Sequence, residues 1–123
     1  MNPYSKFEHA GLAIEVTGAT EEATMVWRGI SDARSPNDFL GPVFKKIIGE
    51  LGRRSITVDF SHLEFMNSWT GSPIISLLKE LDRVGTKTRV VFGAEEWQQV
   101  HMRCIRTIAR VLKNITVEGP SED

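Results

Sequence analysis

The sequence has little of what several large classes of protein require. It contains a single cysteine, Cys104, in 123 residues, which excludes an intramolecular disulfide framework and any zinc site built from several cysteines. No run approaches the roughly 20 apolar residues of a membrane-spanning helix. The first residues, "MNPYSKFEHAG", lack the basic and apolar segments of a secretory signal. We therefore expect a cytoplasmic protein without a membrane span.

Charge and histidine content exclude two further classes. The formal net charge is −1, whereas a protein that coats nucleic acid needs clustered lysine and arginine in excess. The three histidines, His9, His62 and His101, are far apart and lack metal-ligand spacing. No phosphate-binding loop of the G-x-x-x-x-G-K-S/T or G-x-G-x-x-G type occurs. We expect no nucleic-acid partner, no metal and no cofactor.

What is present is a regular alternation of apolar patterns, with 41% hydrophobic residues to build a core. These patterns predict strands over 12–16, 23–28, 55–60, 87–92 and 115–119, and helices over about 36–51, 71–84 and 94–113. The alternation predicts an α/β fold with one mixed, largely parallel sheet of about four to five strands and three helices. We expect one domain over 1–123, with a core at about 12–117, a loose N-terminus and the C-terminal tail "PSED".

Local signals refine the first helix. Ser35 is predicted to cap it, with Pro36 at the first helical position and Asp38 near the positive end of the helix dipole. Pro42 would remove an internal hydrogen bond, so the regular helix is expected to begin only there.

The last helix carries an apolar stripe and a row of cations. The stripe predicted to be buried contains Trp97, Val100, Cys104, Ile105, Ile108, Val111 and Leu112, and Trp27 is also assigned to the core. The cations form either a solvated helix face or a docking surface for an acidic partner; they are Arg103, Arg106, Arg110 and Lys113.

The stretch "FMNSWTGSPII", residues 65–75, is the main candidate for function. Trp69 lies among small polar residues, namely Asn67, Ser68, Thr70, Gly71 and Ser72. Free N–H groups and the dipole favour anions at a helix N-terminus, so a phosphorylated hydroxyl would face the positive end of the helix. Alternatively, Thr70, Gly71 or Ser72 caps the helix without modification, with Pro73 in its first turn.

The segment "ITVDFSHLEFMNSWTGSPIISLLKELDRVGTKTRVVF" resembles the core of STAS domains, the module of anti-sigma factor antagonists and of sulfate-transporter tails. In that family a hydrophobic strand and a hydrophobic pair precede Asp/Asn-Ser-Ser/Thr-Gly, and a helix and a valine-rich strand follow. "MVWRGISDARSPNDF" is similar to the family's strand, Gly-x-x-Asp loop and first helix, and places Asp32 on the loop aspartate. The resemblance covers about residues 12–117 and implies a bacterial, non-enzymatic regulator.

The family resemblance also implies a partner and a switch. In the family, an anti-sigma factor that is a serine kinase phosphorylates the Ser/Thr before the glycine, the complex separates, and a phosphatase restores it. Asn67 and Ser68 match the first motif positions, but Trp69 occupies the acceptor position. Two alternatives follow. Either Thr70 or, less well, Ser68 accepts the phosphate, or the acceptor is lost and Trp69 is an exposed anchor. The partner-binding loop would comprise Asp32, Asn67, Ser68, Trp69, Thr70, Gly71 and Ser72.

Other functions stay open at this point. An enzyme would draw on Asp32, Asp59, Ser68 and Thr70, although no spacing among them specifies a reaction. The resemblance also permits a domain that senses a small molecule such as a nucleotide or lipid, and a scaffold would present a self-associating surface. We expect a partner-binding regulator rather than an enzyme.

Overall fold

Seven strands and three α-helices succeed one another along residues 4–119, the part of the chain that this computed structural model describes. The strands are β1 Tyr4–His9, β2 Leu12–Gly18, β3 Glu22–Ser31, β4 Ser55–Asp59, β5 Leu63–Met66, β6 Thr88–Val91 and β7 Ile115–Glu118. The helices are α1 Asn37–Leu51, α2 Gly71–Arg83 and α3 Glu96–Ala109. A single 3-10 turn, η1 Ser68–Thr70, leads directly into α2.

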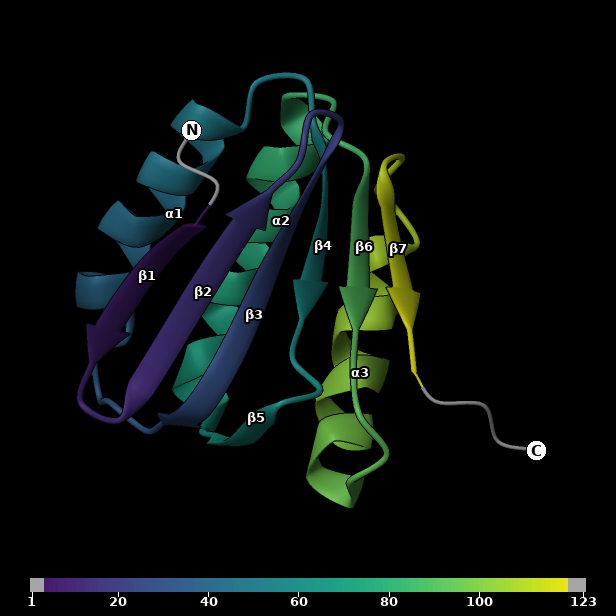
Figure 1. Ribbon diagram of the computed structural model, residues 1–123. Coiled ribbons are helices and arrows are strands. Elements are labelled where there is room, and N and C mark those ends of the chain that lie inside the picture. Colours follow the sequence, from purple (N-terminus) through teal and green to yellow (C-terminus); the bar gives the residue numbers. More distant parts are fainter. Residues whose placement is uncertain (1–3, 120–123) are drawn as a thin grey trace.

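All seven strands belong to one mixed sheet in the order β1-β2-β3-β4-β6-β7, with β5 paired to the far end of β3 (Figure 1). The β1–β2 and β2–β3 pairs are antiparallel, and the other four pairs are parallel. The predicted mixed, largely parallel α/β sheet is therefore confirmed, with more strands than expected. None of the helices in residues 4–119 combines the length and hydrophobicity needed to cross a bilayer.

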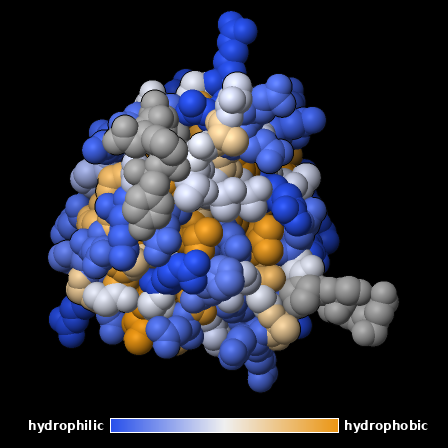
Figure 2. Space-filling view, in the orientation of Figure 1, coloured by the Kyte–Doolittle hydropathy of each residue, from blue (hydrophilic) through white to orange (hydrophobic). Residues whose placement is uncertain are grey.

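The core lies between one face of the sheet and the three helices, which stand behind the strands in Figure 1. Alternate strand residues are buried on this face, as the twofold period of a strand requires. Trp27 is fully buried and packs against Phe44 and Phe60, so its assignment to the core is confirmed. The opposite face of the sheet is open and mainly hydrophilic, with small apolar patches (Figure 2).

Two strands were not expected from the sequence. Residues 4–9, predicted to be loose, form β1, which pairs residue by residue with β2 through a turn at Ala10 and Gly11. Residues 63–66, predicted to be loop, form β5, which pairs with the last residues of β3. Residues 1–3 and the expected tail "PSED" lie outside the described residues.

The ends of α1 differ from the sequence expectation. Ser35 does not cap the helix through its side chain; Pro36 takes the N-cap position, and Asp38 lies in the first turn as expected. The helix runs from residue 37 without waiting for Pro42, which lies inside it. Pro42 is the sixth residue of the helix, so its missing N–H leaves the Asp38 carbonyl without the donor that an ordinary interior residue would supply.

The helix α3 is shorter than predicted and is rotated relative to the predicted stripe. Its buried residues are Gln98, Met102, Ile105 and Ala109. Ile105 was placed correctly, whereas Cys104, Val100 and Val111 are exposed and Trp97 is half-buried. The polar Gln98 is buried because its amide nitrogen donates to the Leu63 carbonyl and its oxygen accepts from the Gly93 N–H.

Gly29 lies where β3 passes close to the turn between β1 and β2. Its φ is +85°, and a Cβ atom there would lie 2.1 Å from the Gly11 carbonyl oxygen. The next residue, Ile30, donates its N–H to that same oxygen at 3.0 Å. The pairing of β3 with β5 also shifts register between Gly29 and Ile30. Only glycine fits this close backbone approach.

Candidate functional site

Two loops leave the sheet side by side at the carboxyl ends of β3 and β5. Ile30 pairs with Phe65 and Ser31 with Met66 in parallel register, so loop 32–36 and the turn 67–70 start as neighbours. In open α/β sheets, ligands and partners bind outside these carboxyl ends. The motif singled out in the sequence therefore lies at the expected edge of the sheet, beside the loop that carries Asp32.

Asn67 holds these two loops together. Its backbone N–H donates to the Ser31 carbonyl at 2.9 Å, and its side-chain Nδ2 donates to the Ala33 carbonyl at 2.9 Å. Its Oδ1 accepts from the Thr70 backbone N–H at 3.0 Å and from the Thr70 hydroxyl at 2.8 Å. Asn67 is thus the cap of the 3-10 turn and, at the same time, a bridge to the end of β3.

Thr70 completes the connection from inside. It takes the N-cap position of α2, one of the three predicted for the cap, but its side chain makes no capping bond. Its hydroxyl lies 2.8 Å from the hydroxyl of Ser31, and both side chains are buried. A hydroxyl donates once, so the consistent assignment has Thr70 donating to Asn67 Oδ1 and Ser31 donating to Thr70 Oγ1.

The geometry of the 3-10 turn sorts its residues into an inner and an outer set. Residues three apart eclipse one another in a 3-10 helix, so Asn67 and Thr70 point the same way, toward Ser31. Ser68 and Trp69 lie between them and face solvent. Trp69 is 56% exposed, whereas Thr70 is 0% exposed. The turn therefore presents a free serine hydroxyl and a large aromatic side by side.

The N-terminal end of α2 favours a negative group, whereas the neighbouring loop adds a carboxylate. The first turn of α2 contains no acidic residue, so no side chain of the helix itself offsets the positive end of the dipole. Gly71 and Ser72 follow, half-buried and exposed, and Pro73 is buried in the first turn. Asp32 is exposed on the neighbouring loop, and no hydrogen bond or ion pair engages it among the described residues.

An aromatic ridge, formed by Phe65, Trp97 and His101, extends the site onto α3. Phe65 is 46% exposed, and its ring centroid lies 6.1 Å from that of Trp97. The Trp97 ring in turn meets the His101 ring edge-on, with 6.0 Å between the centroids. Burial lowers the pKa of His101 below its ordinary value, and a hydrogen bond with the Met66 backbone acts in the opposite direction. This ridge was not expected from the sequence, because Trp97 was assigned to the core.

The candidates for an enzyme are not brought together. Asp59 accepts hydrogen bonds from the Ser61 backbone and hydroxyl, at 2.8 and 2.6 Å, and lies 3.7 Å from His62 Nε2. No hydrogen bond among the described residues joins Asp59 to Asp32, Ser68 or Thr70. The described residues contain no group of three or more histidine, cysteine or carboxylate side chains arranged to hold a metal ion.

Two residues that organise the site were missed by sequence reasoning. Ser31 and Ala33 flank Asp32 and supply the acceptors and the hydroxyl that fix the 67–70 turn. The only signal was their position next to Asp32, because each interaction spans more than thirty residues of chain. The asparagine three residues before Thr70 was a readable capping signal, since asparagine is among the preferred N-cap residues.

No family model and no curated protein matches the chain. Solved structures do match it. The structure of SiaC of Pseudomonas aeruginosa superposes with a TM-score of 0.65 at 15% identity and covers 95% of this chain and 98% of that one. A chain in the structure of the diguanylate cyclase SiaD in complex with its activator SiaC, also from P. aeruginosa, matches with a TM-score of 0.63 at 12% identity. The match covers 94% of this chain and 99% of that one.

The anti-sigma factor antagonist SpoIIAA, solved in its unphosphorylated form, matches with a TM-score of 0.55 at 16% identity over 84% of this chain and 86% of that one. At these identities the likeness concerns the fold alone. The fold is SpoIIAA-like, that is, STAS-like, and this confirms the fold that the sequence resemblance implied.

Proposed function

We propose that this protein is a non-catalytic, single-domain regulator that binds a protein partner through the 66–72 loop, the start of α2 and Asp32. We further propose that phosphorylation of Ser68 controls the binding. The observation that carries this proposal is the contrast within one turn: the Ser68 hydroxyl is exposed, whereas the Thr70 side chain is fully buried and its hydroxyl is engaged by Ser31 and Asn67. A kinase reaches the first without disturbing the fold.

The fold neighbours support a regulatory role. SpoIIAA is an anti-sigma factor antagonist, and SiaC is the activator of a diguanylate cyclase, so this fold serves proteins that act on partners. By analogy, the partner of this chain is an anti-sigma or serine-kinase-type protein, or an enzyme that the domain activates, and a phosphatase would reverse the modification.

Charge explains how Ser68 would act as a switch. A phosphoserine carries about two negative charges at neutral pH. Placed on Ser68, it would lie at the start of the η1–α2 unit, where the dipole of α2 favours an anion. It would also lie next to Trp69, and a charge at the edge of an apolar contact opposes burial of that contact. Phosphorylation is therefore expected to weaken partner binding.

Trp69 is the proposed anchor of the interface. Tryptophan is enriched among interface residues whose truncation costs 2 kcal/mol or more. Its 56% exposure leaves most of the ring free to contact a partner. We expect Trp69→Ser to weaken binding by a factor of about 30 or more, which corresponds to about 2 kcal/mol. Val111→Ser is the matched control, because Val111 is 83% exposed and lies beyond the end of α3, outside the site.

The direct test is phosphate mapping. The wild type, Ser68→Ala and Thr70→Val proteins are incubated with the kinase-type partner captured from the native lysate, and phosphorylated residues are identified by mass spectrometry. We expect phosphate on Ser68, no phosphate in Ser68→Ala, and normal phosphorylation in Thr70→Val. Phosphate on Thr70 in the folded wild type would refute the assignment. A Ser68→Glu variant that binds its partner as tightly as wild type would refute the switch.

A further inference from the structure

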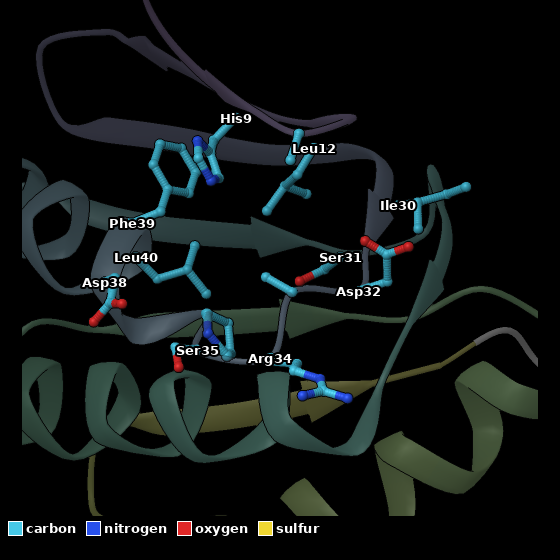
Figure 3. A pocket seen from close by; sticks show the side chains of 13 residues that line it. His9, Leu12, Ile30, Ser31, Asp32, Arg34, Ser35, Asp38, Phe39 and Leu40 are labelled. Carbon is cyan, nitrogen blue, oxygen red and sulfur yellow. The ribbon is translucent and has the colours of Figure 1, made fainter.

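The turn 67–70, here called the switch turn, contacts Ser31, and a cavity of about 310 Å³ lies on the other side of Ser31, toward β1 and α1. It lies between the β1–β2 turn, the end of β3, the loop 32–36 and the first turn of α1 (Figure 3). The volume is at the lower end of the range for ligand pockets, so it suits a compact molecule. Of the residues in the proposed partner-binding surface, Asp32 alone also lines this cavity.

The walls of the cavity are apolar and its ends are charged. Leu12 and Leu40 are buried, and the His9 and Phe39 rings stack at 5.2 Å to close one side. Figure 3 shows these side chains around the cavity. The apolar walls would accept a branched or aromatic side chain.

Charges of opposite sign lie at the edge of this apolar space. Asp32 and Arg34 both line the cavity, yet no ion pair joins them, and no hydrogen bond engages either side chain among the described residues. Figure 3 shows both on one side of the cavity, with Asp38 on the opposite side. An unpaired carboxylate and an unpaired guanidinium at one edge are complementary to a ligand that carries an ammonium and a carboxylate on neighbouring atoms.

We propose that this cavity binds a compact zwitterion with an apolar side chain, that is, a hydrophobic amino acid. The ammonium group would face Asp32, the carboxylate would face Arg34, and the side chain would lie among Leu12, Phe39 and Leu40. Arginine is suited to the carboxylate because its guanidinium presents two parallel donors to the two oxygens.

The cavity is connected to the switch turn by the loop that forms its wall. Ser31 lines the cavity, and its carbonyl and hydroxyl bind Asn67 and Thr70 at 2.9 and 2.8 Å. Ala33 lies between the two charged residues, and its carbonyl accepts from Asn67 Nδ2 at 2.9 Å. A ligand that fixes the side chains on both sides of Ala33 thereby favours one arrangement of the 67–70 turn.

The regulatory part of this inference rests on the proposed function, whereas ligand binding does not. The ligand would set the orientation of Ser68 and Trp69, and so the affinity for the partner or the rate of phosphorylation. Because binding is measured on the isolated protein, its outcome is independent of any partner.

The binding test uses L-phenylalanine as the probe, in calorimetric titration and in ¹H–¹⁵N spectra of the whole chain. Phenethylamine lacks the carboxylate, and 3-phenylpropionate lacks the ammonium group. We expect phenylalanine to bind saturably and each analogue to bind at least about tenfold more weakly, since a charged hydrogen bond is worth about 1.5–3 kcal/mol. Equal binding of phenylalanine and either analogue, or no saturable binding of phenylalanine, would overturn the assignment.

Variants locate the site. Arg34→Ala is expected to weaken phenylalanine binding about tenfold or more while the protein stays folded, because this side chain is exposed. Arg53→Ala is the control, as Arg53 is exposed just beyond the opposite end of α1, about 22 Å along a helix of this length. Equal losses in the two variants would overturn the site.

The coupling has its own readout. With saturating phenylalanine, the amide signals of Asn67 and Thr70 should shift together with those of loop 32–36. In Ser31→Ala, which keeps the cavity wall but cuts the hydroxyl link, the shift at Thr70 should shrink. Shifts confined to the cavity would overturn the coupling. Partner capture and Ser68 phosphorylation are measured without ligand, so they test the proposed function separately. Ligand binding can therefore fail while the proposed function holds, and the reverse.

Discussion

Replacing Thr70 with valine keeps the shape of a fully buried side chain and removes the hydroxyl that joins the two loops. The hydroxyl's 2.8 Å contacts with Ser31 Oγ and Asn67 Oδ1 are lost, together with a longer contact of 3.4 Å to the Ser31 carbonyl oxygen. Asn67 Oδ1 keeps the Thr70 backbone N–H at 3.0 Å, but the buried Ser31 hydroxyl loses its side-chain partner. A buried polar group left without a partner costs about 1–3 kcal/mol. We therefore expect the free energy of unfolding to fall by about 2–3 kcal/mol.

Removing the other hydroxyl of the pair, that of Ser31, should lower the free energy of unfolding by less. In Ser31→Ala the Thr70 hydroxyl still donates to Asn67 Oδ1, so no buried donor is orphaned, and about 1 kcal/mol is expected for the lost hydrogen bond. In the double variant the orphaned Ser31 hydroxyl no longer exists. The double variant should therefore be more stable than the sum of the single effects predicts, by about 1 kcal/mol or more.

Urea unfolding with linear extrapolation measures these differences, provided that fluorescence and circular dichroism give coincident transitions. Thr88→Val is the matched control, because Thr88 is also buried but donates only to the Thr86 carbonyl, at 3.0 Å, and shares no partner with Ser31. Its effect should add to that of Ser31→Ala. If the Ser31 and Thr70 changes were additive to within about 0.3 kcal/mol, the hydroxyl link would not exist in solution.

Three further predictions test other parts of the structure. Gly29→Ala should lower stability by about 2 kcal/mol or more, because a Cβ atom would meet the Gly11 carbonyl at a positive φ, whereas Gly49→Ala, inside α1 with open space around it, should not lower it; similar melting temperatures would contradict this. Cys104 is exposed, so it should react with a thiol reagent as fast in the folded protein as in urea. A much slower reaction in the folded protein would show that Cys104 is buried. Burial lowers the pKa of His101 in the folded state, so the free energy of unfolding should fall as the pH drops below 6.5 and level off below the folded pKa. His101→Gln should remove this part of the pH dependence of stability, and an unchanged pH dependence would argue against burial of His101.

The central strands and the helices were predictable because their patterns are local. The β2, β3, β4, β6 and β7 strands and all three helices fall where the apolar periodicity places them. The two missed strands depend on partners far away in the sequence. The polar β1 is stabilised by pairing with β2 along its whole length, and the four-residue β5 exists only against the end of β3. Such pairing energy is not visible in the strand's own residues.

The error in α3 has a different cause. The helix contains two overlapping apolar rows, and the predicted stripe followed the row that begins at Trp97. The structure buries the row of Met102, Ile105 and Ala109, and it adds Gln98 because two backbone groups satisfy that amide. Which row is buried depends on the position of the sheet against the helix, which the helix sequence does not encode.

For the site, the sequence located the turn but not the orientation of its side chains. The family motif has one acceptor position, and Trp69 aligns with it. The sequence therefore left two alternatives: the acceptor is Thr70 or Ser68, or there is no acceptor. Burial of Thr70 depends on Ser31, which is 39 residues away along the chain. Because Thr70 and Asn67 share the inner side of a 3-10 turn, the two residues between them must face outward.

The same geometry makes the anchor and the switch compatible. Trp69 need not replace an acceptor if the acceptor is its exposed neighbour, since a phosphate on Ser68 would lie beside the ring that we propose the partner buries. A Ser68→Glu, Trp69→Ser double variant tests this arrangement. If the charge acts by opposing burial of the ring, Ser68→Glu should weaken binding strongly in wild type and little once the ring is gone. If the two changes add fully, measured by calorimetry with the captured partner, the charge acts elsewhere on the interface and Ser68 does not control the Trp69 contact.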